Sequence, residues 1–229
     1  MNRPPLGNPS PLRFFFVLSF LVLLFPFLIK PGSVEPFTNI KIEEGPGLFN
    51  AFTPQGDIRR FAGETLYFDI SFLWFKNAAT STVSFVEKDG KFYSVLKAQT
   101  KGFVGWFTSY RKHVYTAYFD IVDNGRRVRA YRFKRLVIIG DDVDKSDHHM
   151  DYAAGIHSWI DTSNGKLVEK RTEKIPKGVI YDDILSAFYN FRNSVYGKLA
   201  KGSNYKLFTI PDKGHDTIYI QIKSEREKE

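Results

Sequence analysis

The sequence predicts a mainly β protein, built as a strongly curved antiparallel sheet or a partly open barrel, with one amphipathic helix covering its open side. Three observations lead to this fold class. Several stretches after residue 63 alternate apolar and polar side chains with a period of two, which is typical of half-buried strands. Short turn signals join these stretches. One stretch, residues 181–196, instead places its apolar residues at helical spacing.

The first strand is predicted within residues 63–74, where every second side chain is apolar. These side chains are Leu66, Phe68, Ile70, Phe72 and Trp74. Residues 81–87 and 91–100 form the next two strands around Asp89-Gly90, because glycine tolerates the positive φ that a type I′ hairpin turn requires.

Three more hairpins follow along the chain. Asn124-Gly125 joins residues 112–122 to 126–139, Ser163-Asn164-Gly165 joins a shorter pair, and the turn at 211–214 joins residues 205–210 to 216–223. The result is a meander of about eight to ten strands. Curving or closing such a sheet protects its edge strands from pairing with other chains.

The helix predicted over residues 181–196 has one apolar stripe and recognisable ends. The stripe contains Ile184, Leu185, Phe188, Phe191 and Val195. Asp182 or Asp183 can accept hydrogen bonds from the first turn, and Gly197 stands where a helix commonly stops. We expect this helix to cover the open side of the sheet.

The N-terminus indicates export. Residues 14–29 form an almost unbroken apolar run between Arg13 and Lys30, which is the pattern of a secretory signal. A membrane-spanning helix needs roughly 20 apolar residues, so export with cleavage is favoured, and an uncleaved anchor is the alternative. We therefore expect a signal peptide or anchor at 1–36, a Pro/Gly-rich linker at 37–62 and a β domain at 63–229. The expected location is the periplasm or cell envelope, on the inner membrane if the run is retained.

Composition narrows the chemistry. The chain has no cysteine, which excludes disulfides, thiolate metal sites and cysteine nucleophiles. Its net charge of +8 would suggest nucleic acid in a cytosolic protein. Behind a signal peptide, anionic lipid headgroups or phosphorylated glycans are better candidates, and a merely soluble basic surface is the alternative. Nucleophile, phosphate-loop and dinucleotide motifs are missing from the sequence, so we expect no enzyme activity and no cofactor.

Three segments carry candidate binding residues. Residues 141–157 gather acids and histidines, of which His148, His149 and Asp151 are weak metal candidates, although neighbouring histidines on a strand point to opposite sides. A polar loop is the alternative there. On the basic stretch 126–135, alternation places Arg127, Arg129 and Arg135 on one face, where guanidinium groups could bind an anionic group. A solvated outer face is the alternative.

The third segment is the aromatic, glycine-bracketed strip at 102–110. It is interpreted as a flexible lip over a cavity or a loop that touches the membrane, with ordinary core packing as the alternative.

Two places resemble a known family. They are the opening strand GETLYFDISF at 63–72 and the helix DDILSAFYNFR at 182–192, followed by a hairpin around Pro-Asp-Lys-Gly. This order resembles an uncharacterised family of exported bacterial proteins, domain of unknown function 3108, over about residues 60–229. The resemblance implies a curved antiparallel sheet, similar in fold to the half-barrels of periplasmic lipoprotein carriers. It brings no catalytic residues, and this chain ends earlier than the pattern, which usually continues with further strands.

The sequence leads to a non-catalytic envelope protein that binds a lipid or other hydrophobic ligand in the concavity of its sheet. The expected lining residues are Leu66, Phe68, Ile70, Phe72, Trp74, Phe188 and Phe191. The alternative is an envelope assembly or scaffold factor that acts through protein partners and is held to the membrane by residues 14–29. A metal-dependent enzyme around His148 and His149 is the third hypothesis. We expect no nucleic-acid partner.

Overall fold

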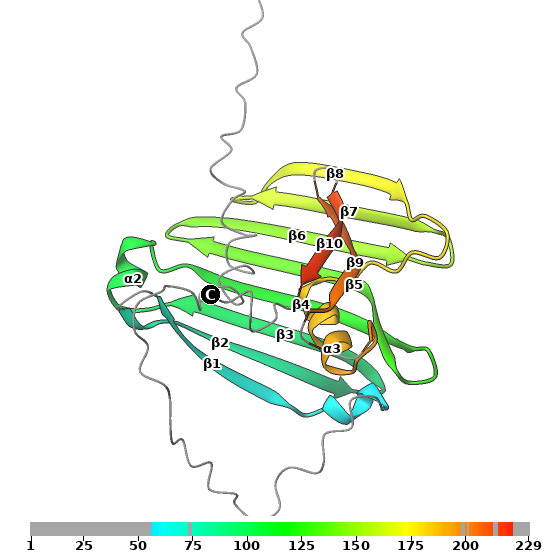
Figure 1. Cartoon of the computed structure of the whole chain (residues 1–229). Helices are drawn as coiled ribbons and strands as arrows, with labels where there is room; N and C mark the ends of the chain where they lie inside the picture. Colours follow the sequence, from blue (N-terminus) through cyan, green and yellow to red (C-terminus); the bar gives the residue numbers. More distant parts are fainter. Residues whose placement is uncertain (1–55, 73–74, 198–199, 201, 213–214, 222–229) are drawn as a thin grey trace, which may run out of the picture. The chain divides into compact units, whose positions relative to one another are not determined.

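The computed structural model describes residues 56–221 except 73–74, 198–199, 201 and 213–214, and these residues belong to one compact unit, Phe49–Ile222. Figure 1 shows one large sheet, helix α3 against one of its faces and a separate short hairpin. The expectations for residues 1–55, for Trp74 and for the 213–214 turn lie outside the described residues, as does the side chain of Phe72.

Eight strands form the large sheet in simple chain order, each antiparallel to the next. They are β1 (Thr65–Phe72), β2 (Phe75–Lys88), β3 (Lys91–Thr100), β4 (Lys112–Val122), β5 (Arg127–Ile139), β6 (Asp142–Asp151), β7 (Ile156–Ser163) and β8 (Lys166–Lys174). The predicted antiparallel meander is confirmed. The sheet does not close into a barrel, so β1 and β8 are its two edges.

The last hairpin does not extend this sheet. Strands β9 (Asn204–Asp212) and β10 (His215–Gln221) pair only with each other in the described chain, as a two-stranded sheet. Its link to the rest of the fold includes a single parallel bridge between Asp182 and Thr209, next to the segment that leads into α3. The predicted hairpin therefore exists, but it belongs to a second sheet.

The predicted turns have the expected backbone geometry. At Asp89-Gly90 the φ angles are 52° and 70°, and at Asn164-Gly165 they are 51° and 76°. Asn124-Gly125 likewise has positive φ at both residues. Left-handed conformations at adjacent positions match the right-handed twist of the strands they join, which explains why these residue types occupy the turns.

The core lies between the sheet and α3 (Ile184–Arg192), which packs against β3, β4 and β5. Tyr189 of this helix is fully buried, and its ring meets the ring of Phe85 edge-on at 4.8 Å between centroids. Val128 on β5 is also fully buried. We call the side of the sheet that carries Phe85 and Val128 the helix-bearing face.

Helix α3 is shorter than the predicted 181–196. It begins after Asp183, whose carboxylate accepts from the amides of Leu185 at 2.7 Å and Ser186 at 3.2 Å in a capping box. It ends at Arg192, and the backbone turns at Ser194 with φ 52°, three residues before Gly197. Local capping therefore decides both ends of the helix.

Residues 102–110 were expected to be a loop, and this expectation is wrong in part. Gly102–Phe107 form a short helix, α2, between β3 and β4. Gly102 adopts φ 56°, which lets the chain turn sharply from the end of β3 into the helix. A one-turn 3-10 helix, η2 (Ile58–Phe61), precedes β1. In the described part of the chain, the helices are too short or too polar to cross a membrane.

Candidate functional site: the helix-bearing face of the sheet

A β-bulge on β5 separates the three arginines that the sequence placed on one face. Tyr118 pairs with Arg132 and Phe119 pairs with Ala130, which leaves Tyr131 as an extra residue. One extra residue moves every following side chain to the other face. The prediction of a shared arginine face is therefore wrong, because Arg135 lies opposite to Arg127 and Arg129.

Two of these arginines have their charge balanced inside the fold. Arg127 donates to the buried carboxylate of Asp182 at 2.8 Å. Arg129 donates to Asp120 at 3.0 Å, and its guanidinium lies 4.8 Å from the ring centroid of Tyr152. The Arg127 contact holds β5 to the segment before α3, and the Arg129 contacts lie within the β4–β5 hairpin and against the β6–β7 turn, so both side chains serve the structure of the protein.

Arg135 is different. The register places it beside Tyr115 on β4 and Ser146 on β6, on the helix-bearing face. It is half-buried and donates to the Ser146 hydroxyl at 3.2 Å. Within the described residues it forms no ion pair with a carboxylate, although Asp144, two residues before Ser146 on β6, and Asp161, opposite Ser146 on β7, lie on the same face. A half-buried cation whose partner is a hydroxyl lacks the negative charge that would balance it.

Aromatic rings and imidazoles surround this guanidinium. The ring of Tyr115 packs edge-on against Phe133 at 5.9 Å, and the Tyr115 hydroxyl lies 3.0 Å from His113 Nδ1. Phe133 in turn lies 6.3 Å from the ring of His148. We define the Arg135 cluster as Arg135, His113, Tyr115, Phe133, Ser146 and His148.

At neutral pH the two histidines of the cluster are neutral, so the positive charge of the cluster comes from Arg135. Burial, followed by the positive charges of Arg111 and Arg135, lowers the pKa of His113 to about 4. Burial, followed by His157 and Arg135, lowers the pKa of His148 to about 3. The single charge within the cluster is therefore the guanidinium of Arg135, and apolar rings around it reduce its exposure to water.

A line of polar side chains continues from the cluster across β7 and β8. His148 Nδ1 lies 3.1 Å from His157 Nε2, and His157 Nδ1 lies 3.1 Å from the Glu173 carboxylate. Because the carboxylate accepts, His157 donates from Nδ1 and receives a hydrogen bond from His148. Trp159 stacks on the buried His157 ring at 4.7 Å. Sequence reasoning missed this line, although the β7–β8 register sets His157 directly opposite Glu173.

The predicted metal candidates do not come together. His149 points to the opposite face, where its Nε2 lies 3.4 Å from Asp147. The Asp151 carboxylate accepts from the amides of Ala153 and Ala154 and so caps a turn. The described residues contain no group of three or more His, Cys, Asp or Glu placed to hold a metal ion. The segment is also mostly strand β6, and the polar-loop alternative is wrong.

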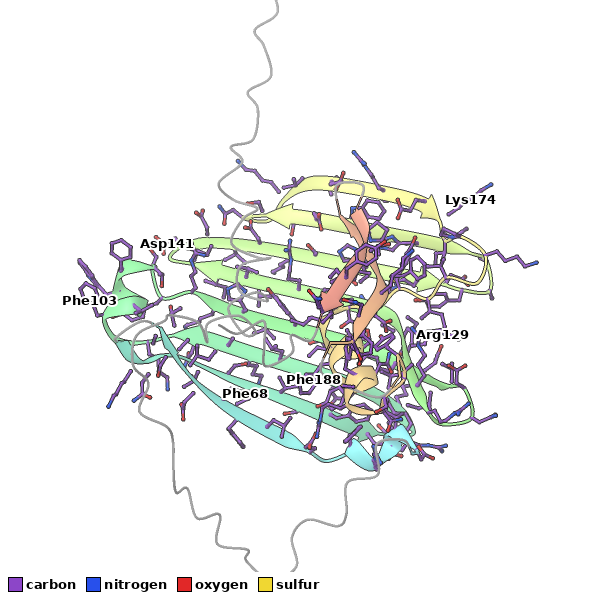
Figure 2. All side chains as sticks on the ribbon, viewed as in Figure 1. Phe68, Phe103, Arg129, Asp141, Lys174 and Phe188 are labelled. Atoms are coloured by element: carbon purple, nitrogen blue, oxygen red, sulfur yellow. The ribbon has the colours of Figure 1, made fainter. Side chains whose placement is uncertain are left out.

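The expected apolar lining residues fall into two groups. Leu66, Phe68 and Ile70 pair with Val83, Ser81 and Ala79, so they lie on the helix-bearing face, with Phe68 36% exposed. The other two lie on α3: Phe188 packs on Tyr189, and Phe191 packs on Tyr196 and Tyr205. Figure 2 labels Phe68 on the β1 strand and Phe188 on the helix.

Two surface hollows, of about 350 and 290 Å³, lie elsewhere. The first is lined by the β4–β5 turn and residues 193–195, and the second by residues 152–155 and 175–179. None of the expected apolar lining residues contributes to either hollow. The apolar residues of β1 therefore form part of a surface of the sheet.

Comparison with known protein families, curated proteins and solved structures finds no match to this chain. Function is therefore inferred from the contacts of its residues. Arg171 on β8 shares the helix-bearing face but pairs with Glu169. Around Arg135, this face combines a cation whose partner is a hydroxyl, neutral imidazoles and aromatic rings, with an apolar row further across the sheet on β1. This combination suits a molecule that has both an anionic group and an apolar part.

Proposed function

We propose that this is a non-catalytic, exported cell-envelope protein that binds an amphiphilic ligand on the helix-bearing face. The anionic group of the ligand would pair with Arg135, and its apolar part would lie across the sheet toward β1. The observation that carries the proposal is the half-buried Arg135 guanidinium, whose partner among the described residues is the Ser146 hydroxyl. An anion there would supply the missing charge, in a charge-assisted hydrogen bond.

Two further observations support this function, and two expectations are included in the proposal. Helix α3 packs on β3, β4 and β5, and the apolar row of β1 lies beyond these strands. A strong curvature of the sheet, which we include in the proposal, would turn the face into a shallow concavity. The apolar run at 14–29 directs the chain to the envelope. Membership of the exported family named above is part of the same proposal.

The polar line through His148 supports binding more than catalysis. His148 and His157 have the hydrogen bonds of an oriented base, but a base needs a nucleophile or an acidic proton within reach. Ser146, the hydroxyl on the same face of β6, accepts from Arg135, and no hydrogen bond joins it to His148 in the described structure. We therefore propose that this line of polar side chains positions His148 within the Arg135 cluster and forms the polar rim of the ligand site.

The test compares palmitate with its uncharged methyl ester, using the full chain and an Arg135→Gln variant. We expect the variant to bind palmitate roughly tenfold more weakly or worse, since a hydrogen bond to a charged group contributes about 1.5–3 kcal/mol. Binding of the ester should not change. Lys134→Gln is the matched control, because its side chain lies one residue away on the opposite face, 3.7 Å from Asp147.

Equal binding of the acid and the ester by the native protein would contradict the Arg135 assignment. Mass spectrometry of solvent extracts from the exported protein is the second measurement. A stoichiometric anionic lipid that is lost from Arg135→Gln, in a variant with native circular dichroism, would identify the ligand class. Inorganic phosphate should be tested in parallel, because competition by free phosphate alone would point to a small anion in place of a lipid.

A second candidate function, an envelope assembly or scaffold factor, is favoured by the β8 edge. This strand is the open end of the sheet, and Leu167 and Val168 on it are 63% and 67% exposed. An exposed apolar edge can pair with a strand of another protein. Photo-crosslinking from position 168 to one partner, together with ligand-free extracts, would favour this function.

A further inference from the structure

Four exposed aromatic side chains gather at the connection between β3 and β4. Phe103, Trp106, Phe107 and Tyr110 are 59%, 66%, 77% and 54% exposed, and the rings of Phe103 and Trp106 are 5.8 Å apart. The first three stand at i, i+3 and i+4 of α2, which places them on one side of the helix. Figure 2 shows Phe103 at the end of the sheet, directed away from the strands. We call these four residues the aromatic tip.

The tip is held in place by hydrogen bonds at its base. The amide of Lys101 donates to Ala78 at 2.8 Å, and the amide of Gly140 donates to Ser109 at 2.9 Å. The Thr108 hydroxyl donates to the Val104 carbonyl at 2.7 Å. The first two bonds connect the two ends of the α2 segment to β2 and to the β5–β6 turn, and the third closes the last turn of the helix. The aromatic exposure is therefore a fixed feature of the fold, because the helix cannot rotate its rings inward without breaking them.

Close packing at Gly105 adds to this rigidity. A Cβ at Gly105 would lie 2.8 Å from the Tyr110 ring, so only glycine allows that ring to cross the helix. The Gly105 carbonyl also accepts from the Tyr110 amide at 2.6 Å. Tyr110 is thereby fixed beside α2, with a polar hydroxyl at the end of an apolar ring.

The charges around the tip favour a lipid surface. Residues 101–112 include Lys101, Arg111 and Lys112 and no acid, while Asp141 and Asp142 lie on the neighbouring β5–β6 turn. The local excess of positive charge is small, so apolar insertion must supply most of the binding. Tryptophan, tyrosine and phenylalanine flanked by cations are the composition found where proteins enter the headgroup region of a bilayer.

The rest of the chain makes this partner accessible. The apolar run at 14–29 is the segment expected to meet a membrane, and residues 30–55 separate it from the described fold. A chain of this length spans at most about 90 Å when extended. If the run is retained in the bilayer, the tip is thus within reach of the same membrane.

We infer that the aromatic tip inserts into the interface of the lipid bilayer. Insertion would remove Phe103, Trp106 and Phe107 from water while the cations remain at the headgroups. This inference extends beyond ligand binding at Arg135 and does not depend on it. It gives the protein a rigid contact with the membrane at one end of its sheet, which is a second contact where the 14–29 run is retained.

The test uses the full chain and measures how deeply Trp106 enters the lipid bilayer. The variant Trp74→Phe/Trp159→Phe leaves Trp106 as the only tryptophan, and it is mixed with phosphatidylcholine vesicles brominated on the acyl chains. We expect lipid-dependent quenching and a blue shift of its emission. The variant Trp74→Phe/Trp106→Phe, which retains Trp159 beside His157, is the control and should show neither.

Substitutions of the tip make the test specific. Phe103→Ser with Phe107→Ser should lower the inserted fraction at least tenfold, because burial of each phenylalanine from water favours insertion by about that factor. Tyr67→Ser on β1, where the side chain is 79% exposed, is the matched control and should leave quenching unchanged. If the chain binds the vesicles by its apolar run and Trp106 is not quenched, the inference is overturned. A blue shift that depends on protein concentration without lipid would also overturn it, since a second copy would then cover the tip.

Discussion

The amide of Asn190 substitutes for a missing strand, and its removal should destabilise the protein strongly. Strand β6 pairs with β5 only at residues 132–139, so Val128 lies beyond that ladder. Asn190 Oδ1 accepts from the Val128 amide at 3.0 Å, and its Nδ2 donates to the Val128 carbonyl and to Asp182, both at 2.9 Å. Asn190 and Val128 are both fully buried. One side chain therefore satisfies two backbone groups that water cannot reach.

The variant Asn190→Leu has a similar volume and removes all three hydrogen bonds. Each buried polar group left without a partner costs about 1–3 kcal/mol, so we expect a loss of roughly 3–5 kcal/mol in the free energy of unfolding. For a domain of this size, the midpoint of thermal unfolding should fall by roughly 10 °C. Asn204→Leu, on an exposed position of β9, is the matched control and should stay within about 0.5 kcal/mol of the native protein.

The assay is urea and thermal unfolding of the full chain in mild detergent, followed by far-ultraviolet circular dichroism. A loss below about 1 kcal/mol for Asn190→Leu, with an unchanged control, would refute the reasoning. It would mean that Val128 finds other partners when the amide is removed, and that apolar packing and the Arg127–Asp182 ion pair suffice to hold α3 to β5.

Two further predictions concern pH and turn geometry. The pKa of His148 is about 3 in the folded protein and about 6.5 when unfolded, so its contribution to stability is present above pH 6.5 and is lost as the pH falls. When the pH is lowered from 7 to 4, the free energy of unfolding of His148→Gln should therefore fall by about 2–3 kcal/mol less than that of the native protein, as measured by urea titrations. Equal falls would show that His148 titrates normally in the fold. Gly125→Ala should be more destabilising than Gly90→Ala by about 1 kcal/mol or more, measured by urea midpoints. Both glycines have positive φ, so both substitutions strain the backbone. At position 125 an added Cβ would also lie 3.1 Å from Asp57, whereas at position 90 it would meet nothing within 4 Å. Similar losses for the two variants would contradict a close approach of Asp57 to Gly125.

The strands and turns were predictable because their signals are local. Alternation in residues 65–72 decides which side chains lie on the helix-bearing face, since successive residues of a strand point to opposite faces. Asp89-Gly90 and Asn164-Gly165 allow the left-handed backbone that a tight hairpin needs. A cap at Asp182 or Asp183 is predicted, and Asp183 is found as the cap, because capping involves only residues two or three positions away.

The site was less predictable because its partners are distant in sequence. The three β5 arginines look equivalent in sequence, yet the bulge at Tyr131 and the acids Asp120 and Asp182 leave Arg135 alone as a candidate anion-binding group. A bulge depends on how two strands meet, and alternation within one strand cannot reveal it. The pairing of His157 with Glu173 likewise requires the β7–β8 register.

Local residue patterns are enough to predict an antiparallel meander with one capped amphipathic helix, because periodicity, turn residues and caps act over a few positions. The folded structure is needed to see that the last hairpin forms its own sheet, that Asn190 completes β5, and that the strip at 102–107 is a helix presenting exposed aromatic rings. These features depend on which surfaces remain for a segment after the other elements have packed. Burial and hydrogen-bond satisfaction are properties of the whole fold, and no short window of residues contains them.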